Sequence, residues 1–305
     1  MPIRDWALIT FTILAQMSVG SFIVLGVAHL FAQRKATMEQ ADKFSDRVLL
    51  AIVPALALGM LASFFHLGSP LSAYLAVARV GASWLSREIL FGVLFGAVGA
   101  VFVLMQWRKI STFPVRRLVA LIACVLGLAL VWSMSMVYMV PAMPAWNTIA
   151  TPLAFFTTTF LLGALAVGAA LVANYAYLQR KDPGCADAQC ELVRAALRWI
   201  ALASIVLLGI EFLVLPVQLG TLATVRAGLG GTGLEIFAGA YGSVLLFRVA
   251  LVFIGVAILG VFLYQNASSP GRERVMGNLT YAAFVLVLIA EVMGRFLFYA
   301  TNPGL

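Results

Sequence analysis

The sequence has few charged residues, and this scarcity decides its broad class. Only 10% of its 305 residues are charged, whereas 63% are apolar. A soluble domain carries about 25% charged residues, and a soluble fold of this size could not hide so much apolar surface. An ordinary globular enzyme, a disordered chain and a disulfide scaffold are therefore excluded. Because one membrane crossing takes about 20 apolar residues, we expect an integral membrane protein with little mass outside the bilayer.

Cysteine and histidine are also scarce, which excludes most metal and haem chemistry. The three cysteines cannot supply the four thiolates of an iron–sulfur cluster. Cys185 and Cys190 flank a short polar loop, but no second ligand pair completes a zinc site, so we expect reduced cytosolic thiols. His29 and His66 are expected near opposite faces of the membrane, where they cannot ligate one haem. We expect no metal-ligated or covalently bound cofactor.

Charge-free apolar runs predict a single all-α membrane domain over residues 1–305, built as a bundle of eight transmembrane helices. Gly68 and Pro70 end the second helix near residue 66. Pro141, Pro144 and Pro152 divide the charge-free run 118–179 into two helices. The helices are expected at about residues 7–32, 47–66, 86–107, 116–140, 151–178, 195–218, 240–264 and 275–300.

The positions of the cations predict the orientation of the bundle. Fourteen of the 20 Lys and Arg residues lie in the connections that follow the first, third, fifth and seventh helices. Only four lie in the segments on the opposite side, namely Arg4, Arg79, Arg87 and Arg226. Because cytoplasmic loops carry the excess of cations, both termini are expected to be periplasmic in a bacterial inner membrane. The net charge of +8 then needs no nucleic-acid partner.

Ionisable residues inside the predicted helices gather in one half of the membrane. Such groups are costly in lipid, so each is a candidate for function. Their common depth favours a single polar pocket near the outer surface over a transport pathway, which would place polar groups near the midplane. The six residues are His66, Glu88, Glu211, Arg248, Glu291 and Arg295.

Each of these residues also has a purely structural interpretation. Glu291 and Arg295 are spaced four apart with the acid first, which allows an ion pair within one helix. Glu211 and Arg248 could pair across two helices. His66 could cap its helix, and Glu88 could be an N-terminal charge favoured by the helix dipole. His66 and Glu88 bracket one outer loop and lie at the same depth, which shifts the balance toward a functional role for these two residues.

A metal-free pocket with a histidine and carboxylates suits a lipophilic ligand that exchanges protons, and a quinol is the natural candidate. A quinol arrives from lipid and loses two protons together with two electrons. Neutral histidine can accept a proton at physiological pH, and a carboxylate can relay it. With no redox cofactor expected in this protein, the electrons must leave for a redox centre in a partner docked on the outer face.

Three blocks between residues 66 and 89 resemble the membrane anchor subunit of bacterial dimethyl sulfoxide reductase. They are HLGSP at 66–70, RVGAS at 79–83 and LSREI at 85–89. Shorter matches follow within 131–156 and 291–299. The resemblance implies an eight-helix anchor with periplasmic termini that oxidises menaquinol in anaerobic respiration and carries no haem. It also implies two partners on the periplasmic face, a four-cluster iron–sulfur subunit and a molybdopterin catalytic subunit.

The resemblance also implies site residues. It assigns the essential histidine to His66 and the quinol-site glutamate to Glu88. An arginine expected between Trp132 and Tyr138 is absent, which leaves the quinone type and site geometry open. The direction of electron flow is open too, because related anchors reduce quinone for sulfite- or formate-oxidising molybdoenzymes. A passive anchor without a quinone site and a transporter are further alternatives. Possible lining residues are Gly68, Ser69, Arg79, Ser86, Glu291, Arg295 and Tyr299.

Overall fold

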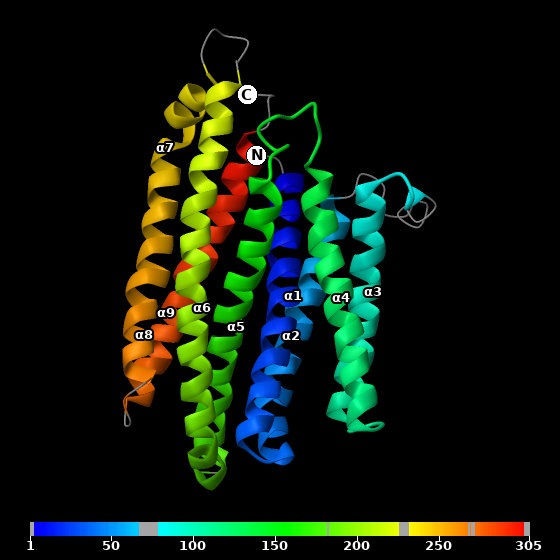
Figure 1. Cartoon of the computed structure of the whole chain (residues 1–305), viewed down its shortest axis with the longest axis vertical. Coiled ribbons are helices and arrows are strands. Elements are labelled where there is room, and N and C mark those ends of the chain that lie inside the picture. The colour runs from blue at the N-terminus through cyan, green and yellow to red at the C-terminus, as the bar shows by residue number, and fades with distance from the viewer. Residues whose placement is uncertain are drawn as a thin grey trace.

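The computed structural model describes residues 3–66, 79–181, 183–225, 232–267, 269 and 272–301. Within these residues, eight helices are long and apolar enough to cross a membrane, which confirms the predicted number. Figure 1 shows them side by side as an elongated bundle. The elements are α1 (Ile3–Lys35), α2 (Met38–His66), α3 (Trp84–Trp107), α4 (Phe113–Val137), α5 (Ala150–Lys181), α6 (Pro183–Thr224), α7 (Gly233–Val252), a π-helical turn (Phe253–Ile258), α8 (Leu259–Ala267) and α9 (Glu273–Ala300).

Most helices are longer than the apolar runs that predicted them. The helix expected at 195–218 begins at Pro183 and ends at Thr224, and the one expected at 47–66 begins at Met38. Apolar runs mark only the part of a helix that must face lipid, whereas polar residues can continue the helix outside it. The helix expected at 116–140 instead ends at Val137, and the one expected at 240–264 is interrupted by the π-helical turn between α7 and α8.

The centre of the bundle is formed by α1 and α5, which have the most buried spans of the eight. Their backbones meet where Gly20 of α1 faces Gly163 of α5. A Cβ at Gly163 would collide with the backbone of Gly20, and a Cβ at Gly20 would collide with the carbonyl group of Thr159. Ser21 Oγ donates a hydrogen bond of 3.5 Å to the Gly163 carbonyl oxygen at the same crossing. Small residues thus allow close helix packing without a hydrophobic driving force.

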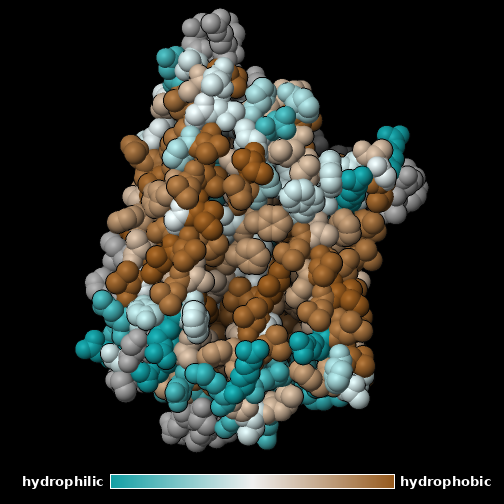
Figure 2. Space-filling model, in the orientation of Figure 1, coloured by the Kyte–Doolittle hydropathy of each residue, from teal (hydrophilic) through white to brown (hydrophobic). Residues whose placement is uncertain are grey.

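The two ends of the bundle differ in polarity. Both termini lie at one end, together with the end of α2 and the start of α3 (Figure 1). Figure 2 shows an apolar belt across the displayed face, with hydrophilic side chains gathered densely at the opposite end. This arrangement agrees with a membrane-spanning bundle. The assignment of the termini to the periplasm stays a prediction from the cation distribution.

Candidate functional site

One face of α9 carries three buried polar side chains near the end that holds the termini. Glu291, Arg295 and Tyr299 follow one another at intervals of four residues, so they share a face of the helix. Their exposed fractions are 3%, 5% and 9%. They are part of a buried group from several helices that we call the polar layer, consisting of Gln16, Glu88, Tyr138, Thr158, Glu211, Arg248, Glu291, Arg295 and Tyr299.

Arg248 of α7 joins two of the three carboxylates of the polar layer, Glu211 and Glu291. Its Nη2 donates to Glu211 Oε1 of α6 and, at 3.5 Å, to Glu291 Oε1 of α9. Its Nε donates to the Ala290 carbonyl oxygen at 3.3 Å. Thr158 of α5 donates a hydrogen bond of 2.6 Å to Glu291 Oε2. The pairing of Glu211 with Arg248 across helices, one of the two interpretations of these residues, is thereby confirmed.

Arg295 has different partners from those that its spacing suggested. The ion pair with Glu291 within α9 is not formed, because within the described residues Glu291 is paired with Arg248 instead. Arg295 Nη2 donates to Gln16 Oε1 of α1 at 2.7 Å. Its guanidinium also lies 3.8 Å from the centre of the Phe155 ring, a distance at which the ring attracts the cation. Arg295 therefore ties α9 to α1 and α5.

An aromatic cluster holds the tyrosine hydroxyl groups of the polar layer in place. Tyr138, directly after α4, and Tyr299 have their hydroxyl oxygens 2.8 Å apart. The Tyr138 ring also contacts Trp146 and Phe298 edge to face. Trp146 Nε1 donates to the Phe298 carbonyl oxygen at 3.0 Å. The segment between α4 and α5 is thus fixed to the end of α9.

Glu88 lies in the second turn of α3 and is 7% exposed. Among the residues that the structure describes, it forms no ion pair. It interacts electrostatically with the hydroxyl groups of Tyr138 and Tyr299. A buried carboxyl group without a counter-charge among the described residues is unusual in a membrane protein, which makes Glu88 a candidate functional residue.

The other predicted site residues differ in whether the structure describes them and in whether they join the polar layer. His66 is the last residue of α2, and its side chain lies outside the described part of the structure, as do Gly68 and Ser69. Ser86, in the first turn of α3, is buried, and its backbone N–H donates to Ser83 Oγ at 3.4 Å. Arg79 is exposed and does not join the polar layer. Glu88, Glu291, Arg295 and Tyr299 do belong to it.

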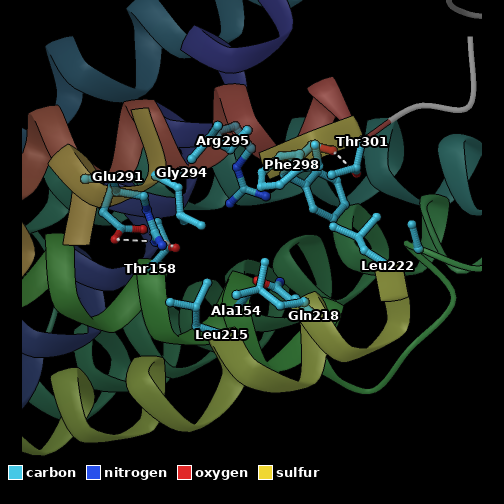
Figure 3. A pocket seen from close by; sticks show the side chains of 16 residues that line it. Ala154, Thr158, Leu215, Gln218, Leu222, Glu291, Gly294, Arg295, Phe298 and Thr301 are labelled. Carbon is cyan, nitrogen blue, oxygen red and sulfur yellow. Dashed lines mark hydrogen bonds and ion pairs between the residues drawn. The ribbon is translucent and has the colours of Figure 1, made fainter. Parts of the chain in front are cut away.

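A cavity of about 80 Å³ opens beside the polar layer, between α5, α6, α7 and α9. Figure 3 shows Thr158 and Glu291 facing each other at one end, with Arg295 and Phe298 farther along α9 and Gln218 on the opposite wall. A water molecule needs roughly 10–15 Å³ of such space, so the cavity accommodates several. Glu211 Oε2 is buried without a hydrogen-bond partner in the described structure, and Glu211 lines a separate, smaller pocket of about 30 Å³, which has room for a water molecule.

Three members of the polar layer were missed by sequence reasoning as site residues. Gln16 and Thr158 are uncharged, so the search for ionisable groups in helices passed over them, although a buried glutamine in an apolar helix is itself a signal. Tyr138 was noted only as a marker of the resemblance. No group of three His, Cys, Asp or Glu side chains gathers as a metal site among the described residues.

Comparison with known proteins identifies the family. Residues 1–301 match the family described as DMSO reductase anchor subunit (DmsC). The sequence is 31% identical to the C chain of the anaerobic dimethyl sulfoxide reductase of Escherichia coli (strain K12), over 98% of this protein and 95% of that one. It is 29% identical to the anaerobic dimethyl sulfoxide reductase chain YnfH of the same organism over the same shares. A shorter match of 31% identity, over 33% of this protein and 31% of the relative, is to the C subunit of the sulfite dehydrogenase of Allochromatium vinosum. This multi-pass membrane protein therefore belongs to the DMSO reductase anchor subunit family.

Proposed function

We propose that this anchor subunit of a dimethyl sulfoxide reductase-like complex oxidises a quinol beside Glu88. The family resemblance indicates that this quinol is menaquinol. The observation that carries the proposal is the burial of Glu88 without an ion pair among the described residues, in the polar layer that also holds the Tyr138–Tyr299 hydroxyl pair. A carboxyl group in this setting can take up and release a proton as its ligand changes state. The polar layer supplies hydrogen-bonding groups that a quinol headgroup could use.

In the proposed mechanism, the quinol enters from lipid between α2 and α3. His66, at the end of α2, accepts a hydroxyl proton, and Glu88 relays it outward. Oxidation of one quinol to a quinone releases two protons and two electrons. The electrons pass to the iron–sulfur subunit and then to the molybdopterin catalytic subunit, both docked at this end of the bundle, which we take to be the periplasmic side of a bacterial inner membrane.

The reverse direction of flow is the second candidate, because one relative is named as part of a sulfite dehydrogenase. In that case the same residues would deliver protons to a quinone. The relatives that match over almost the full length bear the dimethyl sulfoxide reductase name, so we favour quinol oxidation. Identification of the catalytic partner that copurifies with this protein separates the two directions.

The test replaces Glu88 by glutamine in the assembled complex and follows oxidation of a reduced menaquinol analogue in membrane vesicles. Loss of general acid–base function lowers turnover by about a hundredfold or more, and we expect a loss of this order for Glu88→Gln and for His66→Ala. Glu235→Gln is the matched control, because Glu235 is exposed and its role in the capping box of α7 is also performed by glutamine. Unchanged turnover in Glu88→Gln, with the complex still assembled, would refute the proposal.

A further inference from the structure

A second cavity lies at the end of the bundle opposite the termini, among α1, α2, α3 and α4, and is separate from the proposed quinol site. Its volume is about 300 Å³. Apolar side chains, among them Phe22, Phe102 and Leu121, form most of its wall. Arg116 and Arg117, in the first turns of α4, lie at its polar end together with His29, Ser45 and Gln106. The cavity is therefore amphipathic, with a cationic end and an apolar interior.

Arg116 is the unusual residue in this cavity. It is 8% exposed, and its Nε atom is buried without a hydrogen-bond partner in the described structure. No carboxylate of the described residues lies within ion-pair distance of it. A buried guanidinium without an anion is strongly unfavourable, because its charge has lost the stabilisation of water. The site thus lacks a negatively charged partner.

Asp42 and Asp46, the two carboxylates bonded to the cavity residue Gln106, already have a cationic partner. Lys109 Nζ lies 2.7 Å from Asp42 Oδ2 and 2.8 Å from Asp46 Oδ2. Gln106 Nε2 donates to the other oxygen of each carboxylate at 2.9 Å. The Nδ1 atom of His29 is 2.8 Å from Ser45 Oγ. The positive charge of Arg116 therefore remains for a ligand to neutralise.

We propose that this cavity binds an anionic phospholipid. The phosphate group contacts Arg116 and Arg117, and one acyl tail lies along Phe22 and Leu121. A neutral quinone would leave the buried charge of Arg116 uncompensated, and free phosphate would leave the apolar wall empty, so a molecule with both features fits best. Basic pockets between transmembrane helices on the cytoplasmic side are known to select anionic headgroups, and this end is the one that its cations predict to be cytoplasmic.

The test measures lipid binding to the purified, delipidated full-length protein by native mass spectrometry. The probes are phosphatidylglycerol, whose phosphate charge is uncompensated, and phosphatidylcholine, whose phosphate charge is offset by the choline cation and so cannot neutralise Arg116. A hydrogen-bonded charge pair corresponds to about a tenfold preference, and we expect this preference for phosphatidylglycerol in the wild type. Arg116→Gln is expected to abolish it. Arg108→Gln is the control and is expected to keep it, because Arg108 is an exposed arginine at the same end of the bundle, after α3.

A second variant tests the acyl-tail part without changing any charge. Gly26 lines the cavity, and a Cβ added there would meet no atom within 4 Å. Gly26→Leu should fill the cavity and reduce phosphatidylglycerol binding by a similar factor. Without lipid, Arg116→Gln should unfold at the same temperature as the wild type or a higher one, because it removes an uncompensated buried charge. The proposal is overturned if Arg116→Gln keeps the lipid preference, if inorganic phosphate competes with the lipid equally well, or if a quinone copurifies in the cavity.

Discussion

The contact between α1 and α5 allows a sharp prediction about stability, because a single methyl group would disturb it. In Gly20→Ala, the new Cβ would overlap the carbonyl oxygen of Thr159 and lie 2.8 Å from its carbonyl carbon and 3.1 Å from Gly163 Cα. Non-bonded carbon atoms normally stay about 3.5–4.0 Å apart. Because both neighbours are backbone atoms, no side chain can rotate away, and the helices must separate.

The magnitude follows from the required separation. Because the overlap with the Thr159 carbonyl oxygen is severe, the helices must move apart by more than about 1 Å, which forfeits about half or more of the dispersion energy along the crossing. Overpacked sites typically cost about 1–3 kcal/mol, and we expect the upper end of that range for Gly20→Ala. The bond between Gln16 and Arg295 should weaken as well, because Gln16 lies one turn before Gly20 on the same helix.

The assay is unfolding of the full-length protein in mixed micelles, followed by circular dichroism. Gly26→Ala serves as the control on the same helix, since its Cβ would meet nothing within 4 Å. Alanine is favoured over glycine within a helix by about 1 kcal/mol, so the control should be as stable as the wild type or slightly more stable. Equal stability of Gly20→Ala and Gly26→Ala would show that the close packing of α1 and α5 is not essential.

Two further predictions concern the polar layer. Thr158→Val removes the donor to Glu291 and should lower the free energy of unfolding by about 1.5–3 kcal/mol, the range for hydrogen bonds to charged groups. Thr157→Val is the control, because Thr157 is a buried neighbour with no such bond in the described structure, and it should lower the free energy of unfolding clearly less. An equal loss in the two variants would contradict the hydrogen bond between Thr158 and Glu291. In a double-mutant cycle, Tyr138→Phe and Tyr299→Phe should show a coupling energy of about 1 kcal/mol; strict additivity would mean that their hydroxyl groups do not interact.

The sequence was sufficient to predict the eight spans, because long uninterrupted apolar runs in a protein with so little charge are typical of membrane-spanning helices. It predicted the ends of the helices less well. The first residues of α6, from Pro183 onward, are polar and yet helical, and nothing in hydropathy distinguishes a polar helix from a polar loop. The π-helical turn at Phe253–Ile258 could not be predicted either, because its residues are as apolar as those of the helices beside it.

The sequence also predicted which ionisable residues would gather, but not all of their partners. The Glu211–Arg248 pair was one of the alternatives, and it is present. Pairing of Glu291 with Arg295 was wrong because spacing along one helix ignores the neighbouring helices. Arg248 reaches Glu291 from α7, whereas Arg295 donates a hydrogen bond to Gln16 and lies over the Phe155 ring. Such choices depend on packing between distant segments, which one sequence does not reveal.

The central helix α1 contributes residues to both ends of the bundle and contacts α5 between them, at Gly20. Gln16, on one side of Gly20, is bonded to Arg295, while Gly26 and His29, on the other side, line the second cavity. The backbone contact at Gly20 prevents α1 from moving closer to α5 at that point, so a change in the tilt of α1 that keeps this contact pivots about Gly20. Such a pivot that widens the second cavity also moves Gln16 relative to α9.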